Sequence, residues 1–524
     1  MSKDEHRGGG RPPSRQGGAD QRRPTANQEK LERSIATFAR QCPFGDGLLR
    51  WLRASDVTIV RAARSPYSRR WDLHLILPER LGQMFDIDLE MLCLAADFKK
   101  IEPRILDELQ QSLHKLDRVD DELAVLVSSD PSAEKLTSRR PGQTAVLAVD
   151  AARLADRSMP DFPTALAGSL LTVDHFNVTT PLTDPSSFFG RDKDIEDALQ
   201  CLSAGQHLGI FGLRKSGKSS LLNQVERVLD DRGWAIARVD LNAYVGRSER
   251  MSEDLVRRLR GSAQRLQTPV PPLRSTRGNI EQRWIEDLEA LVSALANVAG
   301  ILLIVDEIDT VLPGRVESAG GVAEDRRKML RALVQLRAMI QDTQTRQDVH
   351  PVLFSAGVDA TIFELPRLTG GDNPLYQFSR VKFLEPLDRA ALQRMVRILG
   401  KRSGMRFADH RLAEELAAEY GGHPLLTRQA CSWVHRHRPA NTVPYPVTLD
   451  ALHQAFTARG TGTPLTHAHD TLDELAQWYP DDGALLVSLL AGGSADVGEM
   501  QHAVDYGLVD ADGLVRMRAL MRRA

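Results

Sequence analysis

Short apolar runs alternate with longer amphipathic stretches along most of this chain. Runs of about four to eight apolar residues are typical of buried strands, whereas apolar residues at every third or fourth position are typical of helices. In the first third of the chain this pattern predicts a helix around Leu31 and Phe38, three strands, a helix around Leu109 and two further strands. We expect those strands at 57–60, 73–77, 91–95, 123–127 and 145–149.

The middle of the chain predicts a second, larger sheet. Ile301–Val305 is apolar at every position, which is typical of a parallel strand covered by helices on both faces. Strands alternate with helices here, so we expect a doubly wound α/β sheet with strands at 207–211, 235–241, 300–305, 351–356 and 380–384. Helices dominate from 390 to 436. Residues 466–524 predict short helices and a hairpin around Asp510–Gly513.

Shifts in composition predict the domain boundaries. The first residues are rich in glycine, proline and arginine and nearly lack apolar residues, which indicates disorder. Prolines mark two connectors, and glycines and prolines at 265–278 and 314–324 predict mobile loops. The predicted division is a tail at 1–26, an N-terminal α/β domain at 27–155, a linker at 156–186, a central core at 187–390, a helical lid at 391–436, a linker at 437–465 and a C-terminal domain at 466–524.

Composition narrows the class of protein. Of the 524 residues, 42% are hydrophobic and 26% charged, and the net charge of −2 gives no global signature of nucleic-acid binding. The four cysteines are far apart, which argues against a disulfide framework or a zinc site and indicates a reducing compartment. No apolar run approaches the length of about 18 residues that a membrane span needs. We therefore expect a cytoplasmic protein without a membrane partner.

The segment Gly212–Ser219 fits the phosphate-binding loop pattern G-x-x-x-x-G-K-[ST], between a predicted strand and a predicted helix. Backbone N–H groups in such a loop converge on phosphate oxygens at the positive end of the helix. Lys218 is expected to reach the terminal phosphates, and the Ser219 hydroxyl is expected to bind Mg²⁺. The candidate ATP-binding residues of this segment are Gly212, Arg214, Lys215, Ser216, Gly217, Lys218, Ser219 and Ser220.

A second motif predicts hydrolysis. The apolar run Ile301–Val305 ends in Asp306 and Glu307, which places two acids at the carboxyl end of a buried strand. We expect Asp306 to hold Mg²⁺ and Glu307 to orient or deprotonate the attacking water. No base-reading N-K-x-D pattern follows this strand, so ATP is favoured over GTP. The predicted cofactors are ATP and Mg²⁺.

These motifs resemble those of STAND-type signalling ATPases, relatives of the AAA+ group within the P-loop (ASCE) class. Phe188–Glu196 is similar to a motif that precedes the phosphate loop in that family, and Gly421–Leu426 is similar to the G-x-P motif of its helical lid. The resemblance implies that Gly190, Arg191, Ser355 and Pro424 belong to the nucleotide pocket. It also implies an arginine near the γ-phosphate, for which Arg367 and Arg380 are both candidates.

The N-terminal domain resembles the Mrr-like branch of PD-(D/E)xK restriction endonucleases. Asp72 followed by Asp97-Phe98-Lys99 carries the resemblance, which implies that Asp72 and Asp97 bind Mg²⁺ and that Asp97 and Lys99 are catalytic. Asp97 stands where many relatives have Glu. Further acids are open alternatives or additions to the site, namely Asp86, Asp88 and Glu32. The competing interpretation is an inactive domain of the same shape, used for docking.

The C-terminal domain resembles a winged helix. Its arginines, Arg516, Arg518, Arg522 and Arg523, could contact the phosphate backbone of DNA or could lie at a solvated helix end. In ATPases of this class such a domain is more often an intramolecular lock, and we favour that role.

The sequence therefore predicts an ATP-hydrolysing switch that controls an N-terminal effector. Its expected partners are ATP, DNA as a candidate, and further copies of the chain in an ATP-bound homo-oligomer. With Mg²⁺-dependent DNA cleavage, this architecture would suit defence against phage or foreign DNA. The first alternative is an ATPase regulator or loader whose N-terminal domain binds protein or nucleic acid without cutting. The second is a scaffold that binds nucleotide without turnover.

Overall fold

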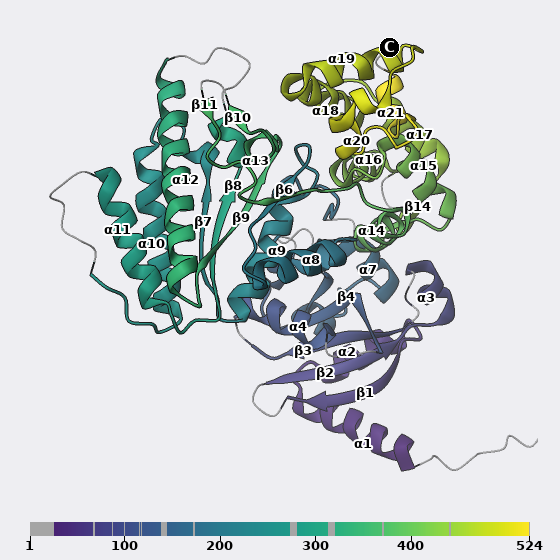
Figure 1. Ribbon diagram of the computed structural model, residues 1–524. Coiled ribbons are helices and arrows are strands. Elements are labelled where there is room, and N and C mark those ends of the chain that lie inside the picture. Colours follow the sequence, from purple (N-terminus) through teal and green to yellow (C-terminus); the bar gives the residue numbers. More distant parts are fainter. Residues whose placement is uncertain are drawn as a thin grey trace, which may run out of the picture.

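The computed structural model describes residues 26–522 except 66–68, 86, 88, 99, 115, 117, 138–143, 171–172, 273–279, 313–319, 369–370 and 440–441. Three bodies are evident in Figure 1: an N-terminal α/β domain, a central α/β domain, and a helical body that contains the C-terminus. The predicted tail lies outside the described residues, apart from the residue that begins the first helix. Within the described part of the chain, no helix is long and apolar enough to cross a membrane.

The N-terminal domain is built on a five-stranded mixed sheet in the order β1-β2-β3-β4-β5. The first three strands pair antiparallel, and β3, β4 and β5 pair parallel. The strands are β1 Thr58–Arg64, β2 Arg70–Ile76, β3 Glu90–Ala96, β4 Val119–Ser128 and β5 Ala145–Asp150. All five strands predicted for this part of the chain are thereby confirmed.

Helices cover both faces of this sheet. Alternate residues of β3 face two different cores: Cys93 packs with α1 and α2, and Leu94 packs with α4. The predicted linker is partly structured, because α7 packs on the same domain. The helices are α1 Ala26–Gln41, α2 Gly45–Arg53, α3 Glu79–Phe85, α4 Arg104–His114, α5 Ala133–Thr137, α6 Ala151–Ala155 and α7 Phe162–Leu170.

The central domain has a parallel sheet in the order β12-β6-β9-β8-β7, as the doubly wound interpretation predicts. All carboxyl ends therefore lie at one edge, where ligands bind in open α/β sheets. Helices α8 and α9 pack on one face, and α10, α11 and α12 on the other. The strands are β6 Leu208–Phe211, β7 Ala235–Asp240, β8 Ile301–Asp306, β9 Pro351–Gly357 and β12 Arg380–Phe383.

The helices of the central domain are α8 Asp192–Ser203, α9 Lys218–Asp231, α10 Glu249–Arg265, α11 Ile280–Ala294, α12 Gly320–Arg346 and α13 Thr361–Glu364. The prediction of a mobile loop at 314–324 is wrong for its last five residues, which form the start of α12. A small hairpin, β10 Arg367–Leu368 and β11 Gly371–Asp372, precedes β12.

The lid and the C-terminal residues share one hydrophobic core, to which Leu412 and Leu520 both belong. At the predicted hairpin, an isolated antiparallel bridge joins Val509 to Val515. The helices of this body are α14 Arg389–Arg402, α15 His410–Tyr420, α16 Pro424–His437, α17 Leu449–Thr457, α18 Pro464–Trp478, α19 Pro480–Leu490, α20 Gln501–Asp505 and α21 Arg518–Met521. A short parallel pair, β13 Met405–Arg406 and β14 Tyr445–Pro446, lies beside them.

Candidate nucleotide site

The phosphate loop leaves the buried strand β6 and enters α9 at the carboxyl edge of the central sheet. Gly217 caps the N-terminus of α9 with φ at 109°, a backbone conformation that a side chain would strain. The first N–H groups of a helix have no partner within the helix, so they are available to an anion. The loop therefore has the local geometry that phosphate oxygens require.

Lys218 is buried at the base of this loop. Its Nζ donates to the carbonyl oxygens of Gly212 and Leu213, at 2.7 and 2.9 Å. Burial lowers the pKa of Lys218, and the nearby Glu307 charge opposes that shift. A buried ammonium group with only carbonyl partners is well placed to gain energy from phosphate charge.

Ser219 and Asp306 form the candidate Mg²⁺ site. The Ser219 hydroxyl lies 3.4 Å from Oδ1 of Asp306. The other carboxylate oxygen, Oδ2, accepts a hydrogen bond of 2.7 Å from Arg238 of β7. Oδ1 also accepts from the Glu307 N–H at 3.2 Å. A hydroxyl and a carboxylate oxygen are hard ligands of the kind that Mg²⁺ prefers, so these residues fit the ion.

Glu307 is the first residue after β8 and has a left-handed backbone, with φ at 51°. Burial raises its pKa, Lys218 opposes that shift, and the neighbouring acids add to it. Two residues later, burial and the Glu307 charge together raise the pKa of Asp309 to about 7. The Glu307 carboxylate, with its raised pKa and its position near the phosphate loop, is suited to accept a proton from water.

The cleft above these residues has a volume of about 570 Å³ and is lined by several parts of the chain. The phosphate loop and β8 supply the floor, and Arg191 lies at the start of α8. Met395 of α14 and Pro424 of α16 line the cleft from the lid side. The remaining wall is the segment 178–182, which lies within the predicted linker.

Hydrogen bonds hold the segment 178–182 against the phosphate loop and α9. The Thr179 carbonyl accepts from Nζ of Lys215 at 2.9 Å, and the Leu182 N–H donates to the Ser220 hydroxyl at 2.9 Å. Sequence reasoning missed this wall because its residues match no phosphate-binding pattern. The available signal was its position directly before the Phe188–Glu196 motif.

Several predicted pocket residues do not line the cleft. Ser355 is fully buried inside β9, two residues before the strand ends, next to Gly209 of β6. Gly190 has φ at 66° and lies against Ala391 of α14, so it allows close packing instead of contacting the cleft. Arg191 does line the cleft, and its guanidinium pairs with Asp194 at 3.2 Å.

Neither candidate for the γ-phosphate arginine lies in the cleft. Arg380 is the first residue of β12 and pairs with Leu208, the first residue of β6, whereas the phosphate loop follows the last. Arg380 is therefore at the opposite edge of the sheet. Arg367 lies exposed on the β10–β11 hairpin and pairs with Asp372 at 3.3 Å.

The structure gives the two predicted carboxylates of the N-terminal domain different partners. Asp72 pairs in register with Leu94, which faces α4, and Arg70 joins Asp72 to Glu108 of α4. Cross-strand partners share a face, and successive residues of one strand alternate between faces. Asp97 directly follows the end of β3, and its N–H donates to the Arg69 carbonyl just before β2.

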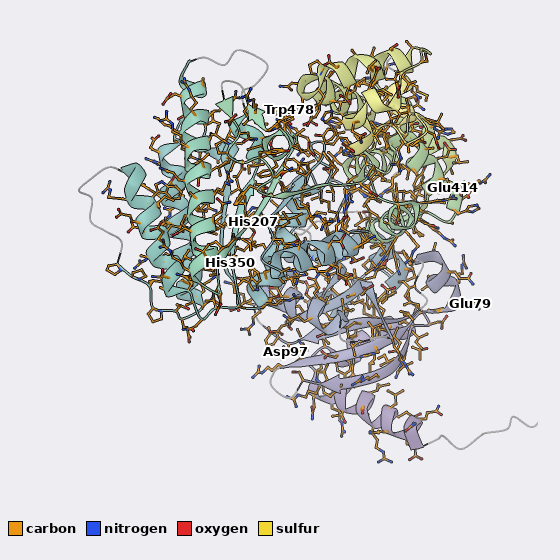
Figure 2. The ribbon with its side chains drawn as sticks, viewed as in Figure 1. Glu79, Asp97, His207, His350, Glu414 and Trp478 are labelled. Atoms are coloured by element: carbon orange, nitrogen blue, oxygen red, sulfur yellow. The ribbon has the colours of Figure 1, made fainter. Side chains whose placement is uncertain are left out.

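The contacts of Asp97 differ from those of Asp72. Asp97 accepts a hydrogen bond of 3.4 Å from Ser129 of the segment after β4. Figure 2 shows Asp97 at the rim of the N-terminal sheet. No group of three His, Cys, Asp or Glu residues that could hold a metal occurs among the described residues. The other residues of this prediction are Glu32, exposed on α1, and Lys99, Asp86 and Asp88, which lie outside the described part.

The C-terminal arginines are engaged within the chain. Arg518 and Arg522 pair with Glu415 and Glu419 of α15. These contacts hold α21 against the lid, which agrees better with intramolecular packing than with a free DNA-binding surface. Arg523 lies outside the described residues.

Comparison with known proteins gives one family and several remote folds. A family model described as Novel STAND NTPase 1 matches residues 181–458, just over half of the chain. No curated protein matches.

Three solved structures illustrate the remote folds. The Walker-type ATPase PABY2304 of Pyrococcus abyssi has a TM-score of 0.42 and 14% identity, covering 66% of this chain and 99% of its own. The Aeropyrum pernix ORC1 protein in complex with DNA has a TM-score of 0.34 and 15% identity, with coverages of 68% and 84%. The Aeropyrum pernix ORC2 protein, in ADPNP–ADP complexes, has a TM-score of 0.38 and 13% identity, covering 61% of this chain and 87% of its own. At these scores the likenesses carry no argument about this chain.

Proposed function

This chain belongs to the novel STAND NTPase 1 family, and on that basis we propose that it is an ATP-hydrolysing conformational switch. The observation that carries the proposal is the meeting of phosphate loop, acidic strand and lid around one cleft. A loop that binds phosphates needs no lid to do so. A lid whose side chains line the same cleft makes the position of the helical body depend on the nucleotide.

Each residue has a definite task in this proposal. The loop N–H groups and Lys218 bind the β- and γ-phosphates, while Glu307 accepts a proton from the attacking water. Ser219 and Asp306 would hold Mg²⁺, which supplies positive charge to the terminal phosphates when it is bound. The N–H donors at the start of α9 belong to a helix that is already formed, so little reorganisation of the helix is needed as charge develops.

Two substitutions test this proposal. Lys218→Ala should abolish ATP binding in a calorimetric titration, whereas Glu307→Gln should keep binding and lower phosphate release by a factor on the order of 10² or more. Lys193→Ala, at an exposed position of α8, is the matched control and should behave like wild type. Unchanged phosphate release in Glu307→Gln would favour a scaffold that binds nucleotide without turnover.

We further propose that ATP favours an open, oligomeric form and ADP the closed monomer. Loss of the γ-phosphate removes contacts that order the switch elements, which shifts the population between the two forms. Light scattering of the Glu307→Gln variant should show a larger assembly with ATP than with ADP. Equal mass in both nucleotides would contradict the oligomeric form of the switch.

For the N-terminal domain we propose a binding module in place of a nuclease. The observation that favours this function is that the two acids have different partners: Asp72 pairs with Arg70, which also pairs with Glu108 of α4, whereas Asp97 accepts from Ser129. Full-length protein incubated with plasmid, Mg²⁺ and ATP should leave the DNA intact. Cleavage that disappears in Asp97→Ala while ATP turnover continues would establish the nuclease instead.

A further inference from the structure

One side chain of the C-terminal body reaches the phosphate loop. Glu474 of α18 accepts a hydrogen bond of 2.9 Å from the backbone N–H of Arg214, and its other oxygen lies 3.2 Å from Nε of the same arginine. Its side chain is only 10% exposed. Backbone N–H groups of this loop are the donors that phosphate oxygens use. A carboxylate therefore occupies a donor that a nucleotide could use.

Glu474 lines a cavity of about 480 Å³ beside the nucleotide cleft, and Arg214 and Lys215 line both. Its carboxylate is within electrostatic reach of both Lys218 and Glu307. These are the residues assigned above to the terminal phosphate and to the attacking water. A γ-phosphate bound there would meet the carboxylates of Glu307 and Glu474, while the Arg214 guanidinium near Glu474 is already paired with it. An additional negative charge in a partly buried site repels the phosphate.

A second contact fastens the same body to the catalytic edge of the sheet. The Tyr479 hydroxyl, at the end of α18, donates to Asp359 at 3.0 Å, and Tyr506 donates to the Val358 carbonyl. The Asp359 N–H in turn donates to Asp309 at 3.4 Å, two residues beyond Glu307. The docking of α18 is thus joined to both the phosphate loop and the acidic strand.

We propose that Glu474 is an additional nucleotide-site residue that makes this closed form selective for a nucleoside diphosphate over a triphosphate. The inference rests on the function proposed above. A triphosphate binds fully only when α18 withdraws and removes the carboxylate. Since α18 shares one hydrophobic core with the lid and with Leu213 of the phosphate loop, withdrawal of α18 also loosens the packing of the lid against that loop. The terminal phosphate thereby selects the conformation through charge.

The test compares ADP with the non-hydrolysable analogue AMPPNP by calorimetric titration of the full chain with Mg²⁺. Wild type should bind ADP more tightly. Glu474→Gln keeps the shape of the side chain and an acceptor for the Arg214 N–H, but removes the charge. We expect it to improve AMPPNP affinity on the order of tenfold to a hundredfold, with little change for ADP.

Asp470→Asn is the matched control. It removes one negative charge one turn earlier on α18, from a residue that lines the same cavity of about 480 Å³ and pairs with His467. It should leave the ADP to AMPPNP affinity ratio at the wild-type value. A ratio unchanged in Glu474→Gln, or shifted equally in Asp470→Asn, would overturn the role of Glu474.

A second variant loosens the docking without touching the phosphate loop. Tyr479→Phe removes the hydrogen bond to Asp359, so withdrawal of α18 becomes easier and AMPPNP affinity should rise severalfold. Unchanged affinity would contradict the withdrawal step. If wild type bound neither nucleotide, the proposed function would fail together with this inference. Binding of both nucleotides with a ratio insensitive to Glu474 would overturn this inference alone.

Discussion

Arg238 orients a candidate metal ligand, Asp306, without being a ligand itself. Its guanidinium joins Asp306 to Glu226 and Asn223 on α9, the helix that begins with the phosphate-loop lysine. One oxygen of Asp306 is thereby held, and the other is turned toward Ser219. Partners that orient a metal ligand in this way typically change metal affinity by a factor of about 10–100 when they are removed.

Arg238→Gln should therefore raise the Mg²⁺ concentration required for half-maximal ATP hydrolysis about tenfold or more. ADP binding measured without Mg²⁺ should stay close to wild type, because no loop donor is altered. Arg238→Lys, which keeps the charge but loses the fork of donors, should give an intermediate value. An equal loss of ADP binding without Mg²⁺ would indicate a general structural defect instead.

His207 predicts a pH dependence of stability. Burial lowers its pKa to about 4, and the charge of His350 adds to the effect; both residues are labelled in Figure 2. In the folded chain Nδ1 accepts from the Leu353 N–H, so the ring is neutral. The unfolded chain binds a proton from about pH 6.5 downward. The contribution is therefore complete above pH 6.5 and is lost as the pH falls toward 4.

In urea denaturation, this one residue should contribute a slope of about 1.4 kcal/mol per pH unit between pH 6.5 and 4. His207→Asn keeps an acceptor for the Leu353 N–H but cannot be protonated in this range. Its free energy of unfolding should depend less steeply on pH by that amount. An identical slope in wild type and variant would contradict the assignment to His207.

The sequence located residues of the cleft where a short stretch of sequence contains the whole arrangement. Lys218 and Ser219 lie in one loop, and Glu307 directly follows one strand, so a local pattern was enough to find them. Arg238 and Glu474 were missed because tertiary packing brings them to the site from other strands and helices. Whether Asp72 and Asp97 share a site depends on the strand register and on the turn after β3, which a spacing of acids does not define.

Gly190 carries a prediction at the level of elements. A Cβ added there would lie 2.2 Å from Cβ of Ala391, so Gly190→Ala should push α14 away from the start of α8. The variant should lose about 2–4 kcal/mol of stability, of which about 1 kcal/mol comes from the positive φ. Because Met395 of α14 lines the cleft, ADP affinity should also fall.

Gly233→Ala separates the two contributions. Gly233 also has a positive φ, at 81°, but a Cβ there would meet nothing within 4 Å. Gly233→Ala should lose only the stability that comes from the positive φ, about 1 kcal/mol, and should keep the ADP affinity of wild type. Equal losses in the two variants, measured by denaturation and by ADP titration, would show that contact with α14 does not matter.

The elements themselves followed from the apolar pattern, but their neighbours did not. Each predicted strand of the two main sheets is present, because buried strands leave continuous apolar runs. The insertion of β9 between β6 and β8 joins residues more than a hundred positions apart and leaves no local signal. Helix α7 was missed because the prolines at 160 and 163 resemble a connector, although Pro163 lies within its first turn.

At the scale of the whole molecule, a buried ion pair joins the lid to the N-terminal domain. Lys401 of α14 contacts Asp120 of β4 at 2.5 Å, and Glu122 lies at 3.7 Å. Both Lys401 and Asp120 are nearly inaccessible to solvent. The same helix lines the nucleotide cleft through Met395, so α14 touches both the cleft and the N-terminal domain.

Lys401→Met should destabilise this interface by about 3–5 kcal/mol, because it leaves the buried carboxylate of Asp120 without the ammonium group that pairs with it. Adding Asp120→Asn should recover part of the loss, since the amide oxygen can still accept from the Glu122 and Leu123 N–H groups. Hydrogen exchange of β4 and α14 would report the effect. A double variant no more stable than Lys401→Met would argue against direct coupling of the pair.

The wall at residues 178–182 affects how such a chain can be recombined. The stretch from 173 to 191 is tied to α16, because Arg428 donates to the carbonyls of His175 and Ser187. Through α7 it also continues directly from the N-terminal domain. A chimera that exchanged that domain at residue 187 would discard part of the nucleotide pocket along with it. A chimera that replaces the N-terminal domain and keeps the nucleotide pocket therefore has to be joined before residue 173.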